Sequence, residues 1–104
     1  MMMQAENLAS LDKFQWQELA PNTFVCRARI CKEEDNRFTA YATRLPGVAS
    51  QGDTFEDAVN NIVDAFTETL KSYLELGVDI PWELDPDVPE NGFLISKSVK
   101  ITAD

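Results

Sequence analysis

The chain is 104 residues long, 44% hydrophobic, and carries a formal net charge of −9. This length is enough for one domain with its own core, and the hydrophobic content excludes an intrinsically disordered chain. The acidic excess argues against binding to a phosphate backbone, and no apolar run reaches membrane-spanning length. Residues 1–10 lack the basic and apolar regions of a secretory signal, so we expect a cytoplasmic protein.

We expect a single domain over residues 1–104, with an amino-terminal extension over 1–23 and a core over 24–102. The extension allows two interpretations. Leu8, Leu11 and Phe14 have the spacing of a short helix face, whereas Phe14, Trp16 and Glu18 alternate as in a strand. Trp16 is costly to expose, so we expect it to pack on the domain or on another subunit.

Two strands joined by a hairpin are predicted next. Side chains alternate over residues 24–32, and a run rich in Thr, Tyr and Phe covers 38–45. A two-residue turn at Asp35-Asn36 would place Ile30 opposite Tyr41 on the helix side of the sheet. The other side would then carry Phe38 with Arg27, Arg29 and Arg44.

The two cysteines, Cys26 and Cys31, are five positions apart in the first of these strands. They should point to opposite faces, about 17 Å apart along the strand. A disulfide needs Cα atoms within about 7 Å, so we expect two reduced, structural thiols. With no His and no CxxC motif, a transition-metal site is not expected.

One long helix is predicted over residues 54–76. Gly52 leads into it, and Thr54 or Asp53 can cap its first turn. Gly77 can close it, and Pro81 prevents its resumption. Its apolar stripe recurs every three or four residues and consists of Phe55, Ala58, Val59, Ile62, Phe66, Leu70, Tyr73 and Leu74.

The segments around the helix complete the architecture. Leu45-Pro46-Gly47 predicts a type II turn before a short strand over 48–51, and residues 93–102 alternate as a last strand. The predicted fold class is α+β: a two-layer, antiparallel β-meander plus one long helix packed on the sheet and a final strand, in the order β-β-β-α-β.

Several motifs in this order resemble the HicB-like antitoxin family, over about residues 24–86. They are Phe38-Thr39-Ala40, Leu45-Pro46-Gly47, Gly52-Asp53-Thr54, Glu56-Asp57-Ala58, and Leu76-Gly77-Val78-Asp79-Ile80-Pro81. The resemblance implies a partial ribonuclease-H-like fold. It also implies a partner: a small basic ribonuclease toxin, inhibited when the antitoxin covers its RNA-binding and active surface.

For such a partner, the candidate contacts are Glu33, Glu34 and Asp35 at the hairpin tip and Asp64 and Glu68 on the helix flank. Each could equally be a solvated charge. Trp82 is either a lid over the end of the helix or an interface anchor.

The chain also departs from the family pattern. Thr43 stands where the family usually has a proline, and residues 87–104 hold no second amphipathic helix and only two lysines. Autorepression through a carboxy-terminal DNA-binding module is therefore not carried over, and we expect no direct DNA binding and no membrane partner. A homo-oligomer is expected, and a solitary scaffold or ligand-binding domain without a toxin is the alternative function.

Catalysis is not expected. A ribonuclease-H-type site needs clustered carboxylates holding two Mg²⁺ ions, but the centre of the first long strand reads Arg27-Ala28-Arg29. Asp53, Asp57 and Asp64 are better interpreted as capping or solvated residues. We therefore predict no catalytic residue, no metal and no cofactor.

The face carrying Arg27, Arg29 and Arg44, with Tyr41 and Phe38 nearby, has two interpretations. It could be a small basic and aromatic platform for nucleic acid, or an outer face or subunit interface whose arginines pair with acidic neighbours. The acidic excess favours the second interpretation.

Overall fold

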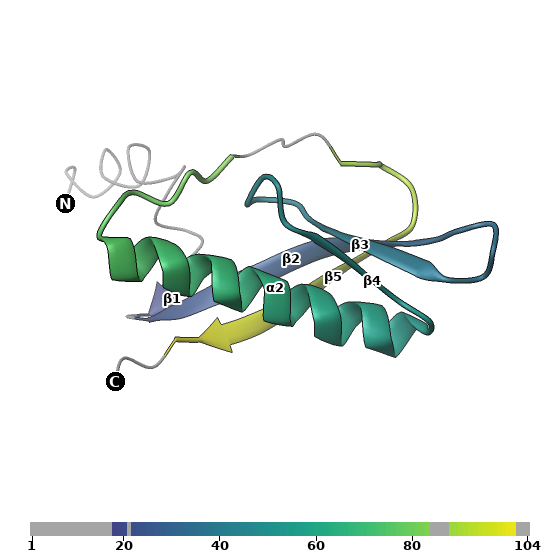
Figure 1. Ribbon diagram of the computed structural model, residues 1–104, viewed down its shortest axis with the longest axis horizontal. Coiled ribbons are helices and arrows are strands. Elements are labelled where there is room, and N and C mark those ends of the chain that lie inside the picture. Colours follow the sequence, from purple (N-terminus) through teal and green to yellow (C-terminus); the bar gives the residue numbers. More distant parts are fainter. Residues whose placement is uncertain (1–17, 21, 84–87, 102–104) are drawn as a thin grey trace, which may run out of the picture.

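The computed structural model describes residues 18–20, 22–83 and 88–101. Within these residues there are five strands and one helix, and the predicted order β-β-β-α-β is confirmed for the four longer strands and the helix. The elements are β1 (Glu18–Ala20), β2 (Thr23–Lys32), β3 (Phe38–Ala42), β4 (Ala49–Gly52), α2 (Phe55–Leu76) and β5 (Phe93–Lys100). The helix lies across one face of the sheet, which gives the expected two layers (Figure 1).

The sheet is antiparallel throughout. β2 pairs with β3 through its second half and with β5 from Thr23 to Ile30. Because Ala28 to Ile30 pair with both strands, β3 and β5 lie on opposite edges of β2. β4 continues the sheet beyond β3, and the short β1 pairs with the start of β2. The order across the sheet is therefore β5-β2-β3-β4, and β1 ties residues assigned to the extension to the core.

The predicted register of the β2–β3 hairpin is wrong by one residue. Within this loop only Asn36 adopts a positive φ, of 69°. The Glu33 N–H donates to the Arg37 carbonyl, so three residues, 34–36, form the turn instead of the expected two. Ile30 therefore pairs with Ala40, and Ala28 pairs with Ala42. A shift of one residue exchanges the two faces of a strand, so every side chain of β3 lies on the opposite face from the one expected.

This shift moves two aromatic residues. Tyr41 lies opposite Arg29 on the face away from the helix, not opposite Ile30. Phe38 lies on the helix side, where its ring meets that of Phe55 edge to face at 6.0 Å. Thr43 rather than Arg44 comes opposite Arg27, because its backbone N–H donates to the Arg27 carbonyl at 2.9 Å.

The helix boundaries follow the predicted signals. Thr54 is the N-cap, and its hydroxyl accepts a hydrogen bond from the Asp57 N–H at 3.0 Å. Gly77 closes the last turn with φ 70°, a left-handed conformation that costs glycine little. The turn at Pro46-Gly47 also has its expected positive φ, 83° at Gly47, and the short strand begins one residue later than predicted, at Ala49.

The core lies between the helix and the sheet. Five of the eight predicted stripe residues are buried: Ala58, Val59, Ile62, Phe66 and Leu70. Near the two ends of the helix, Phe55 and Leu74 are 37% and 43% exposed. The last strand ends at Lys100, and the interpretations of Leu8, Leu11, Phe14 and Trp16 lie outside the described residues.

Both cysteines are buried and free, as predicted. Cys26 belongs to the core, and burial raises the pKa of its thiol to about 12. Cys31 lies near the hairpin, where its thiol donates to the Asn91 carbonyl at 3.3 Å. Burial, followed by the charge of Glu33, raises the pKa of the Cys31 thiol, and Arg29 opposes that shift.

Candidate protein-interaction surface

The hairpin tip presents three carboxylates to solvent. Glu33, Glu34 and Asp35 are all exposed, and the loop that carries them is internally bonded. The Glu33 N–H donates to the Arg37 carbonyl at 2.8 Å, and the Asn36 N–H donates to the Glu33 carbonyl at 3.0 Å. Asp35 also accepts from the Arg37 N–H at 3.1 Å, so the loop holds its acidic side chains on a closed turn.

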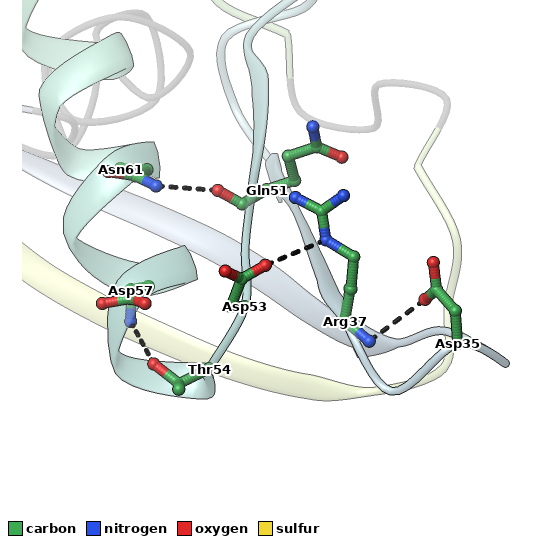
Figure 2. A network of polar contacts seen from close by, with 7 residues as sticks. All are labelled: Asp35, Arg37, Gln51, Asp53, Thr54, Asp57 and Asn61. Carbon is green, nitrogen blue, oxygen red and sulfur yellow. Dashed lines mark hydrogen bonds and ion pairs between the residues drawn. The ribbon is translucent and has the colours of Figure 1, made fainter.

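The hairpin is tied to the start of the helix. Arg37 Nε lies 3.1 Å from Asp53 Oδ1, and Asn61 donates to the Gln51 carbonyl at 2.7 Å (Figure 2). The Arg37–Asp53 pair is solvent-exposed and contributes little to stability, and it links the hairpin to the residue two positions before α2. The first turn of α2 adds two further exposed carboxylates, those of Glu56 and Asp57, at the same end of the molecule (Figure 1).

Asp64 and Glu68 form a separate acidic patch. Both are exposed and one helical turn apart. At 1.5 Å per residue they lie roughly 14 and 20 Å along the helix axis from Phe55, so the fold does not gather them with the hairpin tip. The five predicted contact carboxylates thus belong to two surfaces, one at the hairpin end and one along the helix.

Trp82 does not reach the surface. Its side chain is only 6% exposed, and its ring lies 6.3 Å from that of Phe24 and 6.1 Å from that of Phe66. It therefore covers the core between β2 and the middle of the helix, as a buried lid but not one over the end of the helix. The chain after the helix is anchored beside it, because the Glu83 N–H donates to the Arg44 carbonyl at 2.9 Å.

The sheet face away from the helix carries Arg27, Arg29 and Tyr41, all half-buried. Arg29 and Tyr41 are cross-strand neighbours. The Nε of Arg27 is buried and has no hydrogen-bond partner among the residues that the structure describes. This face is thus a cationic patch on an acidic chain, with its charges on the central strand.

Two features of the surface were not predicted from the sequence. A depression of about 330 Å³ lies beside the Pro46-Gly47 turn. Its lining is mostly apolar and includes one carboxylate: Tyr41, Ala42, Pro46, Gly47, Val48, Ala49, Glu83 and Val88. Sequence patterns miss it because a turn and a distant irregular segment form it together.

The second feature is a pair of exposed hydrophobic residues at the start of β5. Phe93 is 64% exposed and Leu94 is 45% exposed. The ring of Phe93 meets that of Phe55 edge to face at 5.9 Å. Alternation in the sequence had already placed these residues on a strand, but it did not show that the strand lies at the edge of the sheet.

The carboxylates considered for a nuclease are dispersed. Asp53 pairs with Arg37, Asp57 lies in the first helical turn, and Asp64 lies roughly 14 Å along the helix from Phe55. In the part of the chain that the structure describes, no three His, Cys, Asp or Glu side chains are placed to hold a metal ion. No helix within the described ranges is long and apolar enough to cross a membrane.

Comparison with known proteins supports the fold. No family model matches the chain. Over 52 residues the chain is 38% identical to the UPF0150 protein ssr1765 of Synechocystis sp., an alignment covering 50% of this chain and 66% of that relative. The chain therefore spans slightly less than two thirds of the length of the curated relative that it matches.

A solved structure gives the likeness in three dimensions. The chain resembles the N-terminal domain of the Burkholderia pseudomallei antitoxin HicB with a TM-score of 0.56 and 22% identity, over 77% of this chain and 100% of that domain. At this identity the likeness concerns the fold. The HicB-like resemblance found in the sequence motifs is thus confirmed at the level of the fold.

Proposed function

We propose that this chain is a HicB-like antitoxin, a non-catalytic module that neutralises a small basic ribonuclease toxin by covering its RNA-binding and active surface. The observation that carries the proposal is an acidic surface on the fold of an antitoxin domain. Exposed carboxylates cover the hairpin tip, the start of the helix and its flank. In this proposal the chain acts in the cytoplasm, where its two thiols would stay reduced.

The charge suits this task for a physical reason. A ribonuclease that attracts RNA must present cations around its active surface, and a chain of net charge −9 is attracted to the same cations. Electrostatic complementarity raises the association rate and selects against partners of like charge. The two acidic patches would then compete with the phosphates of RNA for one surface of the toxin.

The depression beside the Pro46-Gly47 turn adds a specific contact to this general attraction. Its apolar walls would pack on the stem of a Lys or Arg side chain from the toxin, and the Glu83 carboxylate would meet the charged end. Such a contact would distinguish a basic protein from other cations, because it requires the stem as well as the charge.

The proposal is tested by capture and inhibition. Purified chain is used to capture proteins from a lysate of its host at low salt, and bound proteins are released by added salt and identified. We expect one small basic protein, whose ribonuclease activity falls in proportion to added antitoxin until the two are equimolar. Circular dichroism of the immobilised batch serves as the control that the chain used for capture is folded.

A folded bait that retains no ribonuclease, from a lysate known to express its neighbouring genes, would contradict the proposal. The chain would then be better described as a solitary scaffold or ligand-binding domain. A captured protein whose activity is unaffected by the chain would contradict the proposal equally.

A further inference from the structure

The strand β5 is an open edge of the sheet. It pairs with β2 along one side, and no strand within the described ranges pairs with its other side (Figure 1). The opposite edge is β4, which is only four residues long and carries no charged side chain. Because β5 is twice as long, it offers a longer row of backbone N–H and C=O groups to another strand.

The start of β5 exposes one large hydrophobic side chain on each face of the sheet. Phe93 pairs with Ile30, which is buried in the core, so Phe93 lies on the helix side. Leu94 follows on the opposite face, and both side chains are exposed. A partner lying on one face of the sheet would cover only one of them, whereas a strand added to the edge would pack on both.

The remainder of β5 carries only positive charge. Lys97 pairs with the buried Cys26 and lies on the helix side, whereas Lys100 lies on the opposite face, and both lysines are exposed. In the adjacent strand β2, Arg27 and Arg29 lie on the same face as Lys100. Neither strand contains an Asp or a Glu. Both faces of this edge are therefore cationic, although the chain as a whole has a net charge of −9.

These charges determine which class of strand fits the edge. Opposite charges directly across a strand pair stabilise it, and like charges destabilise it. A basic strand would be repelled, and so would the β5 edge of a second copy, because it carries the same cations. Lysines on an edge commonly protect it from its own kind in this way. The same lysines favour a strand whose carboxylates come opposite them.

We propose that β5 binds an extended acidic segment of another protein by strand addition, at a site separate from the acidic surfaces proposed for the toxin. The added strand runs antiparallel, as do all strand pairs of this sheet, and antiparallel pairing is the more stable kind. Backbone hydrogen bonds hold the segment, and its side chains provide the specificity.

The positions of the lysines define the pattern of the segment. Lys97 and Lys100 are three residues apart on opposite faces, so the segment presents two carboxylates with the same spacing, one toward each face. Because the added strand runs antiparallel, these carboxylates precede an apolar pair that covers Leu94 and Phe93. A segment that spans β5 is thus acidic at its first and fourth positions and apolar at its seventh and eighth.

The probe for this site is a synthetic peptide with blocked ends, Glu-Val-Thr-Glu-Thr-Val-Leu-Val, added to the purified chain. In two matched peptides, both Glu residues are replaced by Gln or by Lys. Binding is measured by calorimetry at 0.15 M salt, where the screening length is about 8 Å. We expect the glutamate peptide to bind roughly tenfold more tightly than the glutamine peptide, and the lysine peptide to bind most weakly. Attraction to the net charge of −9 alone would give the reverse order.

Variants of the chain locate the site. K97E with K100E, shown to be folded by circular dichroism, should reverse the preference and bind the lysine peptide most tightly. K71E is the control, because Lys71 is exposed on the helix, and this variant should keep the wild-type order. The glutamate peptide should also slow hydrogen exchange of the outward-pointing amides of β5 and leave the exchange of β4 unchanged.

Any of four results would overturn the proposal. The first is a glutamate peptide that does not bind wild type, or that binds no more tightly than the lysine peptide. The second is a wild-type order in the charge-reversed variant, and the third is binding that leaves the exchange of β5 unchanged. The fourth is slow exchange of the outward-pointing β5 amides before any peptide is added, since the edge would then already be occupied. No toxin takes part in these measurements, so their outcome is independent of the proposed function.

Discussion

Gly52 illustrates how one residue fixes the contact between sheet and helix. It ends β4, and a β-carbon at this position would overlap the backbone N of Ala58 and approach the Asp57 backbone within 2.7 Å. The neighbouring atoms are helix backbone and cannot move aside as a flexible side chain can. The glycine is therefore required by close approach rather than by its φ angle.

Gly52→Ala should consequently destabilise the fold by about 1–3 kcal/mol, the usual cost of overpacking. Gly47→Ala is the matched control, because a β-carbon there meets nothing within 4 Å and only its positive φ of 83° is strained. The measurement is urea unfolding of both variants beside wild type. A Gly52→Ala variant no less stable than Gly47→Ala would show that β4 and α2 can separate freely.

Burial of the Cys26 thiol predicts that the protein loses stability at alkaline pH. Burial raises the pKa of its thiol from 9.0 to about 12, so between these values the unfolded chain loses a proton that the folded chain keeps. The contribution of this thiol to the free energy of unfolding is fully present below pH 9. Between pH 9 and pH 12 the free energy of unfolding should fall by about 1.4 kcal/mol per pH unit. Cys26→Ala should lack this slope in unfolding curves taken from pH 8 to 11, and parallel curves for the two proteins would contradict the prediction.

At the scale of elements, the helix depends on its first turn. Thr54→Ala removes the hydroxyl that accepts from the Asp57 N–H, and loss of such a cap costs about 1 kcal/mol. For a domain of this size the expected fall in Tm is roughly 4–8 °C. Thr54→Ser keeps the acceptor and should unfold within a degree or two of wild type. Equal losses in both variants would assign the effect to the Thr54 methyl group.

Local signals allowed the helix to be predicted, whereas the hairpin register depended on more than the turn residues. Thr54 and Gly77 act through hydrogen bonds within one turn, so their effect is readable in the sequence. In the β2–β3 loop both Asp35 and Asn36 tolerate positive φ, but only Asn36 adopts it. The position of Phe38 held the missing information, because a large apolar side chain at that end of the sheet packs on Phe55.

The candidate surface was predictable in composition but not in arrangement. The acidic residues of the hairpin and helix are exposed as expected, yet they form two patches, since Asp64 lies roughly 14 Å along the helix from Phe55. The open edge of β5 could not be predicted, because it depends on which strand of the sheet β5 pairs with. Pairing of strands distant in sequence is a property of the whole fold.

At the scale of the whole molecule, charge is segregated. The hairpin tip, the helix and the segments around it hold most of the described carboxylates, whereas β2 and β5 hold none. A basic toxin would therefore be attracted to the hairpin tip and the helix and repelled by β2 and β5.

This separation predicts how the toxin would bind. Neutralising the hairpin tip with E33Q, E34Q and D35N should slow association with the captured ribonuclease roughly tenfold at low salt, because steering by charge acts on the encounter rate. The difference should shrink as salt shortens the screening length to about 8 Å. D64N with E68Q tests the helix patch separately, and E75Q, at the far end of the helix, is the control. Stopped-flow rates that are equal for all variants at low salt would mean that the toxin recognises neither acidic patch.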